Sequence, residues 1–356
     1  MEMTLAWKPD WDRARVALLG WWNHTGLALS VTAPREKPIE DLPAPDPHVP
    51  LETRWLDPAH RVQSALHAMA RTFYGGAAFP ILDNLIGPGS LGMFLDCGVE
   101  FAPDTVWYHP SIAVPEQSGH LRFDPQNKWY QAHLALTQAA LDAARGRYIV
   151  GYPDLIENLD ILAQLRGPQE TLMDLVERPE WALEKIWEIN EAFCAAYDAL
   201  YPLLADPWGG TTFCAFQLWA PGRVAKVQCD SSCMISAADF RKLVQPALEA
   251  QCDWLDYSMY HLDGTQAMHQ LDNLLSIDSL DAIEWTPQAE AMPGGGSPQW
   301  YDLYKRIKAA GKSVQAIGVK PEELQPLLDA VGPEGMYVMM WVDTEREARR
   351  ILDQHW

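Results

Sequence analysis

Short β-like runs alternate with longer helical patterns along most of this 356-residue chain. The expected strands are residues 27–33, 79–84, 147–152, 211–219, 224–230, 256–261, 282–285, 313–317 and 336–342. The expected helices are residues 58–73, 130–145, 180–200, 236–252, 298–310, 321–330 and 344–353. Strands that alternate with helices form βαβ units and a parallel sheet. About eight such strands favour an α/β fold of the closed (β/α)8, or TIM-barrel, type over an open sheet.

The whole chain, residues 1–356, is expected to form one barrel domain with extra N-terminal helices. Residues 1–60 would be an N-terminal extension packed on the barrel. Six prolines between positions 34 and 50 predict an extended surface loop there. No GxGxxG follows the first strand and no Walker A sequence occurs, which argues against the nucleotide-binding α/β folds.

A formal net charge of −21 excludes several classes of partner. Such a chain repels nucleic acid and anionic membranes, although a local arginine cluster could still bind an anion. The N-terminus lacks the pattern of a signal peptide and no run is apolar enough to span a membrane, so a cytoplasmic protein is expected. Sixteen tryptophans predict aromatic packing in the core, in a homodimer interface or around a flat ligand.

The segment Tyr260-His261-Leu262-Asp263-Gly264 carries the strongest chemical signal. In a parallel barrel the catalytic groups stand at the carboxyl ends of strands. Period-two alternation places His261 and Asp263 on the same side, where they could share a proton, orient one another or bind a metal. The simpler alternative is a histidine that hydrogen-bonds to its neighbour to close the loop.

Two further carboxylates end expected strands. Asp230 closes an apolar run and could act as an acid, a base or a ligand, or could simply cap the next loop. Glu284 closes a buried strand, where a carboxylate is costly unless it is paired. Asp230, His261, Asp263 and Glu284 are the predicted catalytic residues, with His261 and Asp263 as the predicted metal ligands. The predicted substrate-binding residues at the other strand ends are Asp83, Asn84, Tyr152, Trp219, Tyr260, Trp285 and Trp341.

Several segments in order resemble the uroporphyrinogen decarboxylase superfamily. They are NHTGLALSVTAPRE, FPILDNLIGPG, YPDLIENLDILAQLRGPQETLMDLVERPE, VQCDSSCMISAADFRKLVQPALE and YHLDGTQAMHQLDNLLSIDSLDAIEWTP. The resemblance covers about three quarters of the chain and implies a (β/α)8 barrel. It also implies one of two chemistries, namely decarboxylation of a tetrapyrrole or methyl transfer in corrinoid systems.

This chain departs from both patterns. The stretch from His24 to Arg35 lacks the arginine pair with which the decarboxylases bind substrate carboxylates. The methyltransferases hold zinc with a His-x-Cys motif and a distant cysteine near the last strand. Here His261 stands at the histidine position, but Asp263 replaces the first cysteine, and the last strand, YVMMWVD, has Met and Trp in place of the second. The resemblance therefore implies either a harder divalent-metal site, zinc included, or no metal at all.

Three functions follow from the sequence. The first is methyl or one-carbon transfer to or from a small-molecule substrate, with a corrinoid protein as partner. The second is a decarboxylase or lyase that uses Asp230 and His261 as acid and base on a hydroxylated or tetrapyrrole-like substrate. The third is a non-catalytic barrel that binds a small molecule, although the ionisable strand ends argue against it.

Overall fold

The computed structural model describes residues 5–288 and 293–356, and its centre is a seven-stranded sheet. The strand order is β2-β1-β13-β12-β11-β10-β9, and every neighbouring pair except β2–β1 is parallel. The strands are β1 (Leu27–Pro34), β2 (Thr72–Gly76), β9 (Val224–Gln228), β10 (Tyr257–Asp263), β11 (Ala282–Thr286), β12 (Ser313–Ala316) and β13 (Met336–Trp341). This confirms the predicted α/β class and parallel sheet.

Six further strands form pairs outside this sheet. β3 (Ile81–Asp83) is parallel to β6 (Ile149–Gly151), β4 (Gly98–Phe101) is antiparallel to β5 (Val106–His109), and β7 (Gly210–Phe213) is antiparallel to β8 (Leu218–Pro221). A single parallel bridge joins Tyr152 to Phe213. In the part of the chain that the structure describes, the ladders do not run continuously from β9 back to β1, so closure into a barrel stays a prediction.

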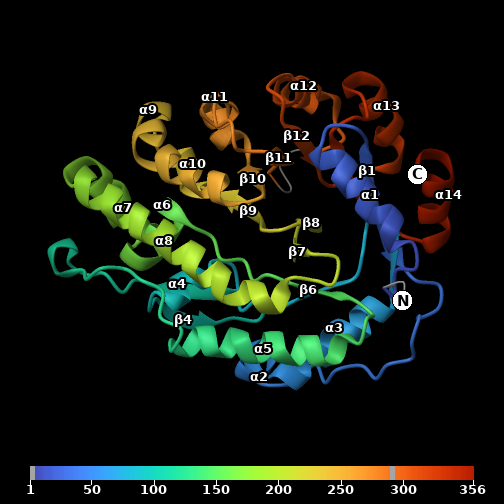
Figure 1. Ribbon diagram of the computed structural model, residues 1–356, viewed down its shortest axis with the longest axis horizontal. Coiled ribbons are helices and arrows are strands. Elements are labelled where there is room, and N and C mark those ends of the chain that lie inside the picture. Colours follow the sequence, from blue (N-terminus) through green and yellow to red (C-terminus); the bar gives the residue numbers. More distant parts are fainter. Residues whose placement is uncertain (1–4, 289–292) are drawn as a thin grey trace.

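The helices lie around the strands (Figure 1). They are α1 (Trp11–Trp22), α2 (Leu51–Leu56), α3 (Pro58–Ala70), α4 (Ser90–Phe94), α5 (Lys128–Ala144), α6 (Asn158–Arg166), α7 (Pro168–Glu177), α8 (Pro179–Leu204), α9 (Ala237–Asp239), α10 (Gln245–Trp254), α11 (Leu271–Leu275), α12 (Tyr301–Ala309), α13 (Pro321–Val331) and α14 (Glu345–His355). None of those in residues 5–288 and 293–356 combines the length and hydropathy that a bilayer span requires.

Three predicted elements differ from the structure. The strand expected at 211–219 is the β7–β8 hairpin, whose turn contains Gln217 with a φ of 50°. The helix expected at 58–73 ends at Ala70, and β2 follows it. The helix expected at 236–252 is interrupted by a π-helical segment, Phe240–Val244, just before Pro246. Proline has no N–H and crowds the carbonyl four residues earlier, which explains the shifted ladder there.

Side chains alternate strictly between the two faces of the sheet. One face, called here the outer face, packs Val227, Tyr260, Ile283 and other apolar side chains into the large core that also holds α8 and α10. The other, the inner face, carries Val224, Met259, Ala282 and Tyr337 in a second apolar cluster. The inner face thus has its own small core.

Helix α1 supplies the aromatic part of that second core. Trp11, Trp21 and Trp22 are all buried; Trp21 packs on Tyr337 of β13 and Trp22 on Tyr257 of β10, whereas Trp11 packs on Trp219 of β8. The indole Nε1 of Trp21 donates to the carbonyl of Val314 at 3.0 Å, and Trp22 Nε1 donates to the carbonyl of Trp219 at 3.0 Å. The N-terminal tryptophans therefore pack inside this chain.

Truncating one of these tryptophans should destabilise the whole fold. Trp21→Ala removes a fully buried indole and its hydrogen bond to Val314, and we expect a loss of about 3–5 kcal/mol in the free energy of unfolding. Urea denaturation followed by circular dichroism measures the change. Trp107→Ala is the control, since Trp107 is 61% exposed. Equal effects of the two substitutions would contradict a packing role for α1.

Candidate functional site

The parallel register sets one row of side chains across the inner face. His261 of β10 pairs with Gln228 of β9 on one side and with Glu284 of β11 on the other, and Glu284 pairs in turn with Gln315 of β12. His261 and Glu284 each stand two positions beyond a residue of the apolar cluster, Met259 or Ala282, toward the carboxyl ends of the strands, whereas Gln315 is level with Tyr337. A polar row therefore follows the apolar cluster on the same face.

His261 and Glu284 form the central pair of this row. His261 Nδ1 lies 2.5 Å from Glu284 Oε2, and Glu284 Oε1 accepts a hydrogen bond from Thr286 at 2.8 Å. The Glu284 side chain is fully buried, whereas the His261 side chain is 14% exposed. Because a carboxylate can only accept, Nδ1 carries the proton, and Nε2 of the neutral ring keeps a free lone pair.

Burial and pairing act in opposite directions on the two groups. Burial alone would lower the pKa of His261, but the hydrogen bond to Glu284 and its negative charge outweigh burial and raise the pKa above its usual value. Burial also raises the pKa of Glu284, against the hydrogen bond and positive charge of His261. Each group therefore stabilises the other, since removal of either one would leave its buried partner without a compensating charge or hydrogen bond.

Asp230 and Asp263 complete a cluster beside His261. One ligand atom from each of Asp230, His261 and Asp263 lies within 4.8 Å of the others, and both carboxylates are exposed. Although Asp230 has open surface, the crowding of protein around it and then the charge of Asp160 raise its pKa to about 6. A catalytic metal site usually has three protein ligands with oxygen or nitrogen donors and leaves a coordination position open for water or substrate.

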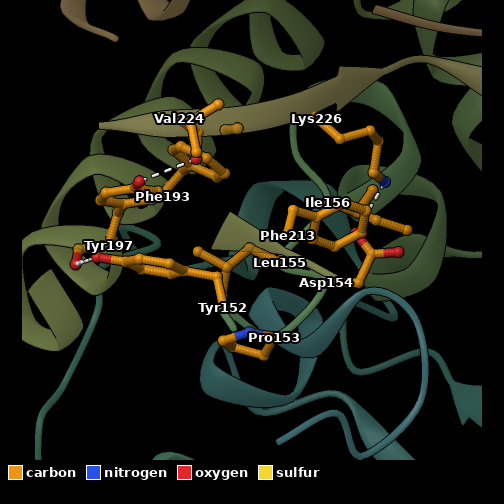
Figure 2. A pocket seen from close by; sticks show the side chains of 11 residues that line it. Tyr152, Pro153, Asp154, Leu155, Ile156, Phe193, Tyr197, Phe213, Val224 and Lys226 are labelled. Atoms are coloured by element: carbon orange, nitrogen blue, oxygen red, sulfur yellow. Dashed lines mark hydrogen bonds and ion pairs between the residues drawn. The ribbon is translucent and has the colours of Figure 1, made fainter. Parts of the chain in front are cut away.

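Several residues that the strand ends did not single out surround this cluster. Phe216, from the β7–β8 turn, packs its ring 5.0 Å from the His261 ring, and Gln315 Nε2 holds the Phe216 carbonyl at 2.8 Å. Lys226 lies on the inner face of β9 and pairs with Asp154 at 2.8 Å (Figure 2). Lys226, Gln228 and Asp230 are spaced two residues apart, so strand alternation could have predicted from the sequence that all three lie on one face. No local sequence pattern identifies Phe216.

The cavity next to Lys226 is too small for a substrate. Tyr152 and Phe213 help to line it, and its volume is about 20 Å³ (Figure 2). Such a space holds about one water molecule. Tyr152 itself is buried, stacks on Tyr197 at 4.0 Å and donates to the Tyr197 carbonyl.

Three other predicted substrate-binding residues are buried in the two cores. Tyr260 and Trp285 are buried in the core of the outer face, and Trp285 packs against Trp300. The reason is alternation, because each is the strand neighbour of an inner-face residue, His261 or Glu284. Trp219 is buried beside Trp11 in the second core and donates to Asp206.

Three predicted binding residues remain at other strand ends. Asp83 is paired with Arg61 at 3.0 Å, in the wall of a cavity of about 360 Å³. Asn84 is buried and donates to Thr137. Trp341 is 60% exposed at the end of β13. The structure therefore assembles the four predicted catalytic residues in one place, whereas most of the predicted binding residues are buried in the interior.

Comparison with known proteins bears on the fold. No family model and no curated protein matches the sequence. Among solved structures, a methyltransferase from Methanosarcina mazei has a similar fold, with a TM-score of 0.58 and 10% sequence identity. The match covers 96% of this chain and 97% of that protein. The overall architecture is thus that of a known α/β enzyme, while membership in the uroporphyrinogen decarboxylase superfamily stays a prediction.

Replacing Glu284 should lower the pKa of His261. In Glu284→Gln the burial of the imidazole and the charge of Lys226 are opposed only by the smaller effect of Asp230, so we expect the pKa of His261 to fall below its ordinary value of about 6.5. Titration of the histidine ring protons by NMR in metal-free protein measures it. Glu345→Gln, which removes a carboxylate paired with Arg349, should leave the pKa of His261 unchanged. An unchanged value in Glu284→Gln would rule out the proposed pairing.

Proposed function

We propose that this chain is an enzyme of methyl or one-carbon transfer that uses a divalent cation held by Asp230, His261 and Asp263. The observation that carries the proposal is the approach of these three ligands to within 4.8 Å, with the buried Glu284 behind the histidine. A ligating histidine usually donates its other ring N–H to a carboxylate, which fixes its tautomer and orientation. Glu284 has that relation to His261.

The donor set fits a cation of intermediate or hard character. One imidazole and two carboxylates are suitable ligands for Zn²⁺, Fe²⁺ or Mn²⁺, and they lack the thiolates that select softer metals. Cys229, the cysteine next to Asp230, is buried in the core of the outer face. A thiolate-rich centre of the kind that the resemblance implies for corrinoid methyltransferases is therefore not proposed.

The residues around the cation have separate parts to play. When bound, a divalent cation would act as a Lewis acid that lowers the pKa of an acceptor group on the substrate. Glu284 keeps a proton on Nδ1 of His261, so that the neutral ring presents its basic nitrogen, Nε2, to the cation. Phe216 packs against the ring and reduces its contact with water.

The methyl-transfer assignment rests on two further supports. The structurally similar protein is a methyltransferase, and the His261 segment resembles the corrinoid-linked branch of the superfamily. On this basis we propose a closed (β/α)8 barrel, a corrinoid protein as methyl donor and a small molecule as acceptor. Methylcobalamin with a thiol acceptor provides a direct assay, because loss of the methyl group changes the absorption of the cobalamin. Retained transfer in His261→Ala would contradict the site assignment.

A second candidate is acid–base decarboxylation or lyase chemistry by Asp230 and His261. It is favoured by their pKa values, because burial and the charge of Asp160 raise that of Asp230 to about 6, and Glu284 raises that of His261 against the effect of burial. Removal of bound metal with a chelator separates the candidates. A metal-assisted transfer would lose activity, whereas acid–base chemistry would keep it.

Cation binding should depend on both the ligands and pH. We expect isothermal titration with Zn²⁺ to show one site in the wild-type protein, and a loss of at least about tenfold in affinity in His261→Ala or Asp263→Asn. His48→Ala, at an exposed loop position, is the control.

Because a cation binds the carboxylate of Asp230 and the neutral ring of His261, affinity should also fall as pH falls through about 6, the raised pKa of Asp230, and through the raised pKa of His261. Equal affinity at pH 7.5 and pH 5 would exclude Asp230 as a ligand.

A further inference from the structure

The loop that follows β6 brings three acidic residues to the end of β9. Asp154, Glu157 and Asp160 come from this loop and the first turn of α6, and all three contact residues of β9 or the turn beyond it. The backbone is strained on the way, since Ile156 and Asn158 have φ angles of 55° and 42°. A non-glycine residue with positive φ costs free energy and persists only when the surroundings hold it there.

Asp160 binds the backbone of the turn that carries Asp230. Its Oδ2 accepts from the N–H of Asp230 at 2.8 Å, and its Oδ1 accepts from the N–H of Ser231 at 2.9 Å. These are the first two N–H groups of the short 3-10 helix η2 (Asp230–Met234). Such groups lack partners inside their own helix, so Asp160 caps η2 from a distant part of the chain.

Gln228 ties the same carboxylate to the Asp230 side chain. Its Nε2 donates to Asp160 Oδ2 at 3.2 Å and to Asp230 Oδ2 at 2.9 Å. The orientation of the amide is fixed because its Oε1 accepts from Lys226, which in turn pairs with Asp154. Glu157 holds the backbone N–H of Gln228 at 2.6 Å. Asp160 thus restrains the backbone of Asp230, and Gln228, which is bound by Asp160, restrains its side chain.

We infer that Asp160 is a positioning residue, which sets the place of the Asp230 carboxylate relative to His261. The inference rests on the proposed function, in which Asp230 binds the cation. The alternative is a purely structural carboxylate such as Asp174, which is buried and pairs with Arg166 and Arg178. Asp160 differs from Asp174 because its hydrogen bonds go to the turn that bears a proposed ligand.

The test compares Asp160→Asn with Asp174→Asn in the full-length protein. Asparagine keeps one acceptor oxygen, so at least one of the two backbone hydrogen bonds is lost. We expect hydrogen exchange at the amides of Asp230 and Ser231 to rise about tenfold or more in metal-free Asp160→Asn. We also expect about tenfold weaker binding of Co²⁺, used as a spectroscopic probe, with an altered d–d absorption band. Asp174→Asn should lower the melting temperature and leave both readouts unchanged.

Each outcome decides one proposal. Unchanged amide exchange in Asp160→Asn overturns the positioning role, and so does raised exchange with wild-type Co²⁺ affinity and spectrum. If the wild-type protein itself takes up no Co²⁺, the metal-assisted function fails on its own. A crystal structure of Asp160→Asn then decides the positioning role, and an Asp230 carboxylate unmoved relative to His261 would overturn it.

Discussion

The parallel register of β9, β10 and β11 is the constraint on which the candidate site depends. It sets Gln228, His261 and Glu284 side by side on the inner face. A fully buried carboxylate must find a donor, and His261 is the donor that the register supplies to Glu284. The orientation of the imidazole is consequently decided by the fold, before any ligand binds, and the free nitrogen is presented at no further entropic cost.

The carboxylates near His261 and Glu284 fall into two groups, those hydrogen-bonded within the protein and those exposed to solvent. The interior carboxylates of Asp154, Glu157 and Asp160 each accept from a buried amine or a backbone amide of β9 and η2. Asp230 and Asp263, in contrast, are open to solvent. The carboxylates of Asp230 and Asp263 are therefore free to interact with a cation or a proton, whereas those behind them are stabilised by hydrogen bonds within the protein.

The sequence predicted the parts of the molecule that local periodicity controls. Strand–helix alternation predicted the parallel sheet, and period two predicted that His261 and Asp263 share a side. The same rule, applied to Tyr260 and Trp285, would have placed them in the core instead of the site. The β7–β8 turn was missed because Cys214 to Gln217 contain no glycine, proline or asparagine to mark it. Asp160 was missed because its partners lie about seventy residues away, and no local pattern shows which distant amides a carboxylate will bind.

The tryptophans of α1 have a consequence for how this protein can change. Trp21 and Trp22 pack at the amino-terminal ends of β10, β12 and β13, while the ionisable groups stand at the carboxyl ends. The side chains that stabilise the fold and the ionisable side chains of the candidate site therefore lie at opposite ends of the same strands. Over evolution, the loops beyond β9, β10 and β11 can accept new side chains with little penalty in folding. A histidine–carboxylate site at the carboxyl ends of the strands is the kind of variation that such a division tolerates.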